Sequence, residues 1–208
     1  MCGRFWVDED TAREINKIIR TTEDKIRQAA AESELQLSAK DIHPAGSAPI
    51  LLAGNFGICY EWQHWGLQGR QQPDTRKRGT LIFNARSETA LERPMFKESA
   101  LHRRAVIPAS GFYEWNRQKE KNIFTRKDAK VLFMAGFYKL TEKGKCFVVL
   151  TTQANASMEP VHERMPLILE EDEITEWIYQ DDKTEELLHK VPCQLECRTE
   201  YRQLGLFE

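Results

Sequence analysis

Hydrophobic and polar residues follow two different spacings along this chain. From residue 8 to residue 34, apolar side chains recur every three to four positions, which predicts an amphipathic helix lying over a core. Residues 170–180 and 184–190 show a similar spacing and predict two shorter helices near the end of the chain. Asp8 or Asp10 is a suitable N-cap for the first helix, because a carboxylate accepts hydrogen bonds from its free backbone N–H groups.

Short apolar runs lie between these helices and predict β-strands. They are rich in β-branched and aromatic residues and are bounded by turn residues. Gly144 and Lys145 are expected to close a hairpin, and the polar segments 69–79 and 117–130 are expected to form a loop and a second hairpin. These patterns predict one α+β domain over residues 1–208, built on a largely antiparallel sheet. The predicted strands are residues 50–53, 56–62, 81–83, 105–109, 131–140 and 145–152.

Composition narrows the class of protein. Hydrophobic residues make up 41% of the chain and charged residues 30%, as in an ordinary globular protein. With a net charge of −2, any contact with nucleic acid has to use a local groove. The chain contains neither an apolar run long enough to span a bilayer nor a visible secretory signal, so we expect a cytoplasmic protein that joins the nucleoid when bound to DNA.

Cysteine spacing gives no support for a metal site. The chain has five cysteines, and only Cys193 and Cys197 are close together, without a second pair at zinc-site spacing. A reducing compartment also argues against disulfides. We therefore expect no metal, and the chemistry considered next needs no cofactor. We also expect a monomer, because no predicted helix shows a sustained apolar seam on its outer face.

The second residue carries the most unusual chemistry. Removal of Met1 exposes Cys2 with a free α-amine beside its thiol. The amine can condense with an aldehyde to an imine, and the thiol can close on the imine carbon to give a thiazolidine ring. An α-amine has a pKa of about 7.7–8.0, so part of it is neutral and nucleophilic near pH 7. A cysteine at this position also occurs by chance, so the argument depends on the rest of the chain.

Four further blocks accompany this N-terminus. With the N-terminal CGRF (2–5), they are WGL (65–67), NARSET (84–89), GFYEW (111–115) and HERMP (162–166). Together, and in this order, they resemble the SOS-response-associated peptidase (SRAP) family, whose members act as sensors of abasic sites. The resemblance covers nearly the whole chain. It implies a barrel-like, mostly antiparallel core with flanking helices.

The resemblance implies a catalytic role for four residues. Cys2 would be the nucleophile, and Asn84 would hold the N-terminus and the opened deoxyribose. Glu114 would act as general acid and base, for which its position in an apolar strand is suitable. His162 would assist opening of the sugar ring. If the resemblance is set aside, each of these residues has a purely structural explanation. Asn84 would cap the turn after its strand, Glu114 would pair with Arg86, and His162 would be a loop residue bonded to backbone.

Five other residues resemble DNA contacts of the family. Arg4, Arg86 and Arg164 correspond to phosphate-binding arginines, because a guanidinium donates two hydrogen bonds to phosphate oxygens. Trp65 and Trp115 offer flat surfaces on which bases can stack, although large aromatic side chains more often fill cores. Neither kind of contact reads base edges, so sequence preference should be weak.

These residues predict a sensor that forms a thiazolidine crosslink with an abasic site in single-stranded DNA. The main alternative is a cysteine peptidase that uses Cys2, His162 and Glu114, with self-removal of Met1 included. A lyase that nicks the strand through the imine, and a non-covalent single-strand binding module in which Cys2 is incidental, also remain open.

Overall fold

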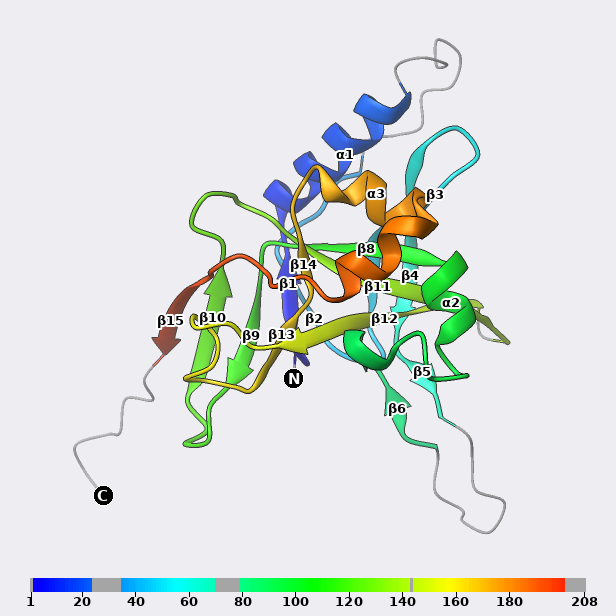
Figure 1. Ribbon diagram of the computed structural model, residues 1–208. Coiled ribbons are helices and arrows are strands. Elements are labelled where there is room, and N and C mark those ends of the chain that lie inside the picture. Colours follow the sequence, from blue (N-terminus) through cyan, green and yellow to red (C-terminus); the bar gives the residue numbers. More distant parts are fainter. Residues whose placement is uncertain (1, 24–34, 70–78, 143, 201–208) are drawn as a thin grey trace, which may run out of the picture.

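The computed structural model describes residues 2–23, 35–69, 79–142 and 144–200. Its centre is a closed β-barrel (Figure 1). The ring closes because one long strand, β12, pairs with β11 on one side and with β4 on the other. All pairings around the ring are antiparallel except the β12–β4 pair. The barrel strands are β3 (Ser47–Ala53), β4 (Ile58–Trp65), β8 (Arg104–Ala109), β11 (Leu132–Thr141) and β12 (Gly144–Gln153).

Three short strands extend this sheet at the rim of the barrel. Strand β7 (Asn84–Arg86) runs parallel to β12, and β13 (Arg164–Pro166) pairs with the last residues of β12. Strand β14 (Ile168–Leu169) pairs with β11. Because β7 and β13 both pair with β12 at Thr151, the NARSET and HERMP blocks meet at one end of this strand.

A second, five-stranded antiparallel sheet lies beside the barrel (Figure 1). Ser110 joins the two sheets between β8 and β9, and its N–H donates to the carbonyl of Trp6 at 2.9 Å. This sheet holds the N-terminal strand between two of its other strands. Its order is β15 (Glu196–Glu200), β10 (Lys121–Thr125), β9 (Gly111–Trp115), β1 (Phe5–Val7) and β2 (Lys40–Ile42), and a separate pair is formed by β5 (Leu67–Gln68) and β6 (Leu81–Ile82).

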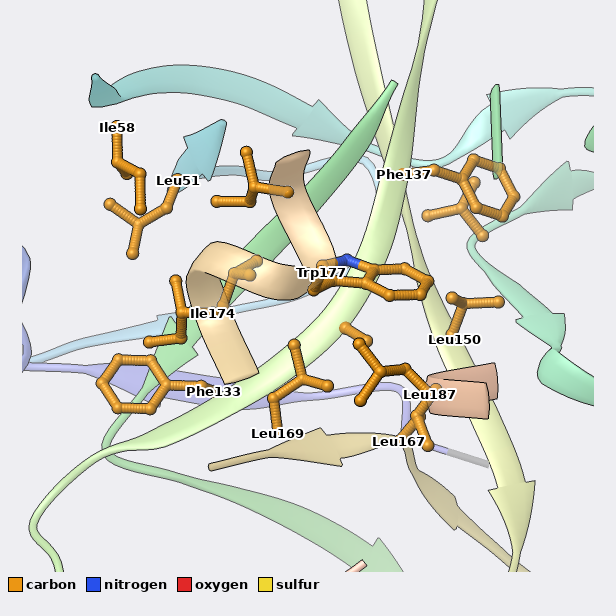
Figure 2. Close-up of a cluster of buried hydrophobic side chains, with 14 of the residues drawn as sticks. Leu51, Ile58, Phe133, Phe137, Leu150, Leu167, Leu169, Ile174, Trp177 and Leu187 are labelled. Carbon is orange, nitrogen blue, oxygen red and sulfur yellow. The ribbon is translucent and has the colours of Figure 1, made fainter. Parts of the chain in front are cut away.

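Alternation along the barrel strands produces two cores. In β12, Phe147 and Val149 belong to an inner core, whereas Val148 and Leu150 face the helices. Successive strand residues point to opposite faces, so the period of two in the sequence sorts the side chains between them. Figure 2 shows the outer core, where Trp177 lies among aliphatic side chains. The inner core also contains Cys2.

Helices cover the outer core. They are α1 (Glu9–Glu23), α2 (Lys97–His102), α3 (Glu173–Tyr179) and α4 (Thr184–Leu188), with short 3-10 helices η1 (Ser87–Thr89) and η2 (Asp181–Lys183). Asp8 accepts hydrogen bonds from the N–H groups of Asp10 and Thr11 at 3.0 and 3.2 Å, so Asp8 is the N-terminal cap of α1. In α3, the Trp177 indole donates to the carbonyl of Ala105 at 3.0 Å.

The predicted α+β fold with a barrel-like, mostly antiparallel core is confirmed. The two C-terminal helices and the β11–β12 hairpin are also confirmed, although Thr141 pairs with Gly144 and the turn therefore precedes Gly144. The first helix is present to Glu23, and residues 24–34 of its predicted range lie outside the described residues. Most of the predicted 69–79 loop also lies outside them. The segment 117–130 contributes β10, the second strand of a hairpin with β9.

Candidate active site

Cys2 lies at the entrance to β1, and the fold buries it. Only 1% of its surface is exposed, and its side chain belongs to the inner core. Phe5 and Val7, both fully buried, anchor the following strand between β9 and β2. The carbonyl oxygen of Cys2 accepts a hydrogen bond from Nδ2 of Asn84 at 2.8 Å. The N-terminal segment is therefore held by Asn84 at Cys2 and by β9 and β2 along β1.

Asn84 carries a second polar atom at this site. Asn84 is the first residue of β7 and pairs with Val149 of β12. Its Oδ1 atom is buried and accepts no hydrogen bond from the part of the chain that the structure describes. Because a buried acceptor without a donor is costly, such an atom indicates a place where a ligand donates. An amine or a sugar hydroxyl would satisfy it.

Glu114 faces the same interior from β9. Its side chain alternates with the outward-facing Tyr113 and Trp115, and the residue is only 7% exposed. It stands opposite Asn122 of β10, which is also buried. Its charge acts on the thiol of Cys2. The structure thus brings Asn84 of β7 and Glu114 of β9 together with Cys2, which precedes β1.

The thiol of Cys2 is held in its neutral form. Burial raises its pKa from 9.0 to about 12, and the negative charge of Glu114 contributes in the same direction. A hydrogen bond from the backbone of Arg4 opposes the change without cancelling it. At neutral pH the sulfur is therefore a thiol, not a thiolate.

This protonation state predicts slow alkylation of Cys2. Lowering the thiolate fraction from that of a pKa of 9.0 to that of a pKa of about 12 should slow iodoacetamide at pH 8 about 1,000-fold relative to the unfolded chain. The rate should rise with pH, because the small thiolate fraction of the folded protein keeps growing until the pH nears the raised pKa of about 12. Peptide-level mass spectrometry measures the rate at Cys2 separately from the other cysteines.

Glu114→Gln should accelerate this alkylation, because the variant removes a negative charge that disfavours the thiolate. Glu200→Gln is a matched control, since Glu200 lies on β15 of the same sheet and pairs with Lys121. Alkylation of native Cys2 at the rate of an unfolded chain would contradict this account of the site.

His162 lies in the loop that leads into β13. Its Nδ1 accepts a hydrogen bond from the backbone N–H of Arg164 at 2.9 Å, and the backbone N–H of His162 donates to the carbonyl of Met158 at 3.0 Å. The residue lines a cavity of about 390 Å³. The cavity lies between this loop and the β9–β10 turn, which contributes Arg117 and Gln118. The pairing of Arg164 with Gln153 places the loop that carries His162 at the end of β12.

Arg4 is bound on the outer face of the five-stranded sheet. It forms an ion pair with Asp41 of β2 and lies over the ring of Tyr113 at 5.0 Å. Burial raises the pKa of Asp41, but the hydrogen bond and charge of Arg4 outweigh it and leave this pKa lowered. Burial and the Asp41 carboxylate raise the pKa of Tyr113. Arg4 is thus partly neutralised, with 30% of its side chain exposed.

The other two predicted phosphate contacts differ from each other. Arg86 ends β7 and is exposed. The side chain of Arg164 is only 13% exposed and forms two hydrogen bonds with Glu88, at 2.5 and 2.8 Å, and its contact with a phosphate stays a prediction. It also donates to the carbonyl of Thr151 at 2.5 Å. The hydrogen bonds of Arg164 lower the pKa of Glu88.

The two tryptophans also differ. The stacking of a base on Trp65 stays a prediction. The ring is fully buried in this structure, and its N–H donates to the carbonyl of Phe83 at 2.8 Å. It packs against Phe5 and Phe147, with ring centroids 5.0 and 6.1 Å away. Trp115, at the end of β9, is 39% exposed and is accessible for stacking.

Sequence reasoning missed the partners of the charged residues. Glu88 and Tyr113 lie inside the NARSET and GFYEW blocks, so the blocks themselves carried a signal. Asp41 carried none, because only the pairing of β1 with β2 brings it next to Arg4. Among the described residues, no group of three His, Cys, Asp or Glu side chains could hold a metal ion. No helix within this described part is long and apolar enough to cross a membrane.

Fold and site together define a class of protein: a closed barrel with a five-stranded sheet at its side, in which a cysteine at position 2 is buried between an asparagine and a glutamate. Residues 1–203 match the family described as SOS response associated peptidase (SRAP), and the chain belongs to this family.

Relatives in this family share a common description. The chain is 35% identical over 187 residues to the abasic site processing protein YoqW of Bacillus subtilis, covering 86% of this chain and 80% of that protein. It is 28% identical over 160 residues to the abasic site processing protein HMCES of Xenopus tropicalis, covering 64% of this chain and 46% of the relative. The aligned part is therefore about half of the length of that vertebrate relative.

Solved structures share the fold. A phage-related protein from Bordetella bronchiseptica superposes with a TM-score of 0.72 at 18% identity, covering 98% of this chain and 96% of that chain. A protein from Bacteroides thetaiotaomicron gives a TM-score of 0.70 at 21% identity, with coverage of 95% and 91%.

Proposed function

We propose that this protein processes abasic sites in single-stranded DNA by forming a thiazolidine crosslink through Cys2 after loss of Met1. The observation that carries the proposal is the arrangement around Cys2, whose carbonyl is held by Asn84 at 2.8 Å and whose thiol lies in the field of Glu114. Relatives named abasic site processing proteins support the choice of substrate.

The first step converts the closed sugar to its aldehyde. A base removes the proton of the C1′ hydroxyl and an acid protonates the ring oxygen, so that the C1′–O4′ bond breaks. His162 and Glu114 are the candidates for these proton transfers. The neutral amine of Cys2 then attacks C1′, the carbonyl oxygen leaves as water, and an imine forms. Oδ1 of Asn84, buried without a donor among the described residues, is suited to accept a hydrogen bond from the amine or a sugar hydroxyl.

Ring closure follows without a further reagent. The sulfur of Cys2 adds to the imine carbon, and the thiol proton ends on the nitrogen. A neutral thiol supplies both the nucleophile and this proton. Glu114, whose charge acts on the thiol, is the candidate to transfer the proton from sulfur to nitrogen. The product has lost the C=N bond that promotes β-elimination, so the strand is shielded from cleavage.

The side chains proposed to contact DNA are those that the structure leaves exposed to solvent. Arg86 is exposed at the end of β7, next to the segment that holds Cys2, and Trp115 offers part of its ring for stacking. Because phosphate contacts dominate such binding, salt should weaken the encounter that precedes the crosslink. The protein would act as a monomer in the cytoplasm, on DNA.

The peptidase alternative requires different chemistry. A cysteine peptidase uses a thiolate, which is usually stabilised by an adjacent imidazolium. A thiol whose pKa lies near 12 is a poor thiolate source at neutral pH. The crosslinking function needs no thiolate in the resting site, so the raised pKa of Cys2 is compatible with it.

A denaturing gel tests the proposal. Purified protein, checked by mass for loss of Met1, is incubated with a single-stranded oligonucleotide that carries one abasic site. We expect a shifted band that survives heat and detergent, with the mass of protein plus DNA minus one water. Intact DNA and Cys2→Ala are the controls, and neither should give this stable band. Fully processed protein that forms no such band across a range of pH and salt would overturn the proposal.

A further inference from the structure

Glu88 and Arg164 form a brace between two segments of the site. The pair is bidentate, with N–O distances of 2.5 and 2.8 Å. Such fork-like pairs fix the orientation of the guanidinium as well as its position. The same guanidinium donates to the carbonyl of Thr151 at 2.5 Å, so Arg164 is tied to η1 and to β12 at once. Only 13% of its side chain is exposed, which limits competition from water.

The brace reaches His162 through the backbone of Arg164. The N–H of Arg164 lies 2.9 Å from Nδ1 of His162. A backbone N–H can only donate, so Nδ1 has to accept with its lone pair. The neutral imidazole then carries its proton on Nε2. The carbonyl of Arg164 is more distant from Nδ1, at 3.2 Å, so the N–H contact is the one that sets the tautomer.

The brace also connects His162 to the residue that holds Cys2. Glu88 lies in η1, which follows directly after β7, and β7 begins with Asn84. Asn84 donates to the carbonyl of Cys2. A continuous series of contacts therefore runs from Cys2 through Asn84, along β7 to Glu88, and through Arg164 to His162. The pairing of β7 and β13 with β12 brings these two segments together, and the Glu88–Arg164 ion pair links them directly.

We propose that Glu88 is a positioning residue that acts through Arg164 to hold His162 in its Nε2–H tautomer and in register with Cys2. In this structure the guanidinium of Arg164 is bound to Glu88 and to the carbonyl of Thr151. The effect on crosslinking rests on the proposed function above, whereas the tautomer does not. The two parts can therefore be tested separately.

The tautomer is read by NMR of protein labelled with ¹⁵N-histidine, without DNA. In the wild type, we expect Nδ1 of neutral His162 to show the shift of an unprotonated nitrogen. Glu88→Gln removes the charge that holds Arg164, and Arg164→Lys removes the second hydrogen bond of the fork. Both variants should give His162 a mixture of tautomers. Glu98→Gln, which removes the partner of Arg103 on α2, is the matched control and should leave His162 unchanged.

Crosslinking kinetics give the second test. Misplacing an acid–base group typically costs about tenfold to 100-fold in rate, so Glu88→Gln should slow crosslinking by about tenfold. In a His162→Ala background, where there is no imidazole to position, Glu88→Gln should change the rate by less than about twofold. A purely structural role would instead slow both backgrounds equally.

The outcomes are distinct. Two results together support the proposal: mixed tautomers in both variants, and a slower rate in Glu88→Gln only when His162 is present. An unchanged Nδ1 signal in Glu88→Gln and Arg164→Lys overturns it, and so does an equal loss of rate with and without His162. If the wild type forms no crosslink at all, the proposed function fails, and the NMR result alone decides whether Glu88 positions His162.

Discussion

Acetylation of the α-amine of Cys2 is expected to abolish the covalent complex with abasic DNA. The first covalent bond of the proposed mechanism joins this nitrogen to C1′, and an amide nitrogen cannot form the imine. Retention of Met1 should have the same effect, because the nitrogen of Cys2 is then part of a peptide bond. The thiol remains in both forms, so the experiment separates amine chemistry from thiol chemistry.

A series of N-terminal variants makes this test quantitative. Cys2→Ala retains the amine but not the sulfur, so it should form an imine that appears on a denaturing gel only after reduction with borohydride. The acetylated protein should give no band with or without borohydride. The wild type should give its band without reduction, since ring closure has already removed the C=N bond.

Two results would contradict the amine mechanism. A heat-stable complex formed by the acetylated protein would show that sulfur alone attacks the sugar. Cleavage of peptides by the acetylated protein, lost on His162→Ala, would establish the thiol peptidase in its place. The raised pKa of Cys2 argues against that second result, because a peptidase of this kind depends on the thiolate.

Much of the barrel could be predicted from sequence because its strands are long and regular. In β11 and β12, residues alternate between the inner and outer cores, and both faces are apolar, as the continuous apolar runs indicated. The three-residue strands β1 and β2 could not be predicted in the same way. Such short segments carry no periodicity, and only pairing with β9 and with each other makes them strands.

The candidate site shows a similar division. Cys2 and Asn84 were singled out from sequence, and the structure joins them by a hydrogen bond. The state of Arg164 could not be foreseen, because a sequence does not say whether a cation faces solvent or a carboxylate. That depends on the pairing of β7 and β13 with β12, which brings Glu88 within reach of Arg164.

The two tryptophans of the predicted DNA surface provide the last test, since one is fully buried and the other is not. Trp65→Ala should lower the free energy of unfolding by about 3–5 kcal/mol, as truncations of large buried aromatics do. The variant also leaves the carbonyl of Phe83 without the indole donor that it has at 2.8 Å. Because Trp65 packs against Phe5 of β1, the N-terminal strand should loosen as well.

Trp115→Ala is the matched comparison. With 39% of its surface exposed, Trp115 should contribute less than about 1 kcal/mol to stability, whereas loss of a stacking surface should weaken binding of single-stranded DNA by about 1–3 kcal/mol. Urea unfolding followed by circular dichroism measures the first quantity, and fluorescence anisotropy with intact single-stranded DNA measures the second. Equal stability losses in the two variants would contradict the burial of Trp65. Unchanged DNA affinity in Trp115→Ala would remove this ring from the binding surface and leave Arg86 as the exposed contact still to be tested.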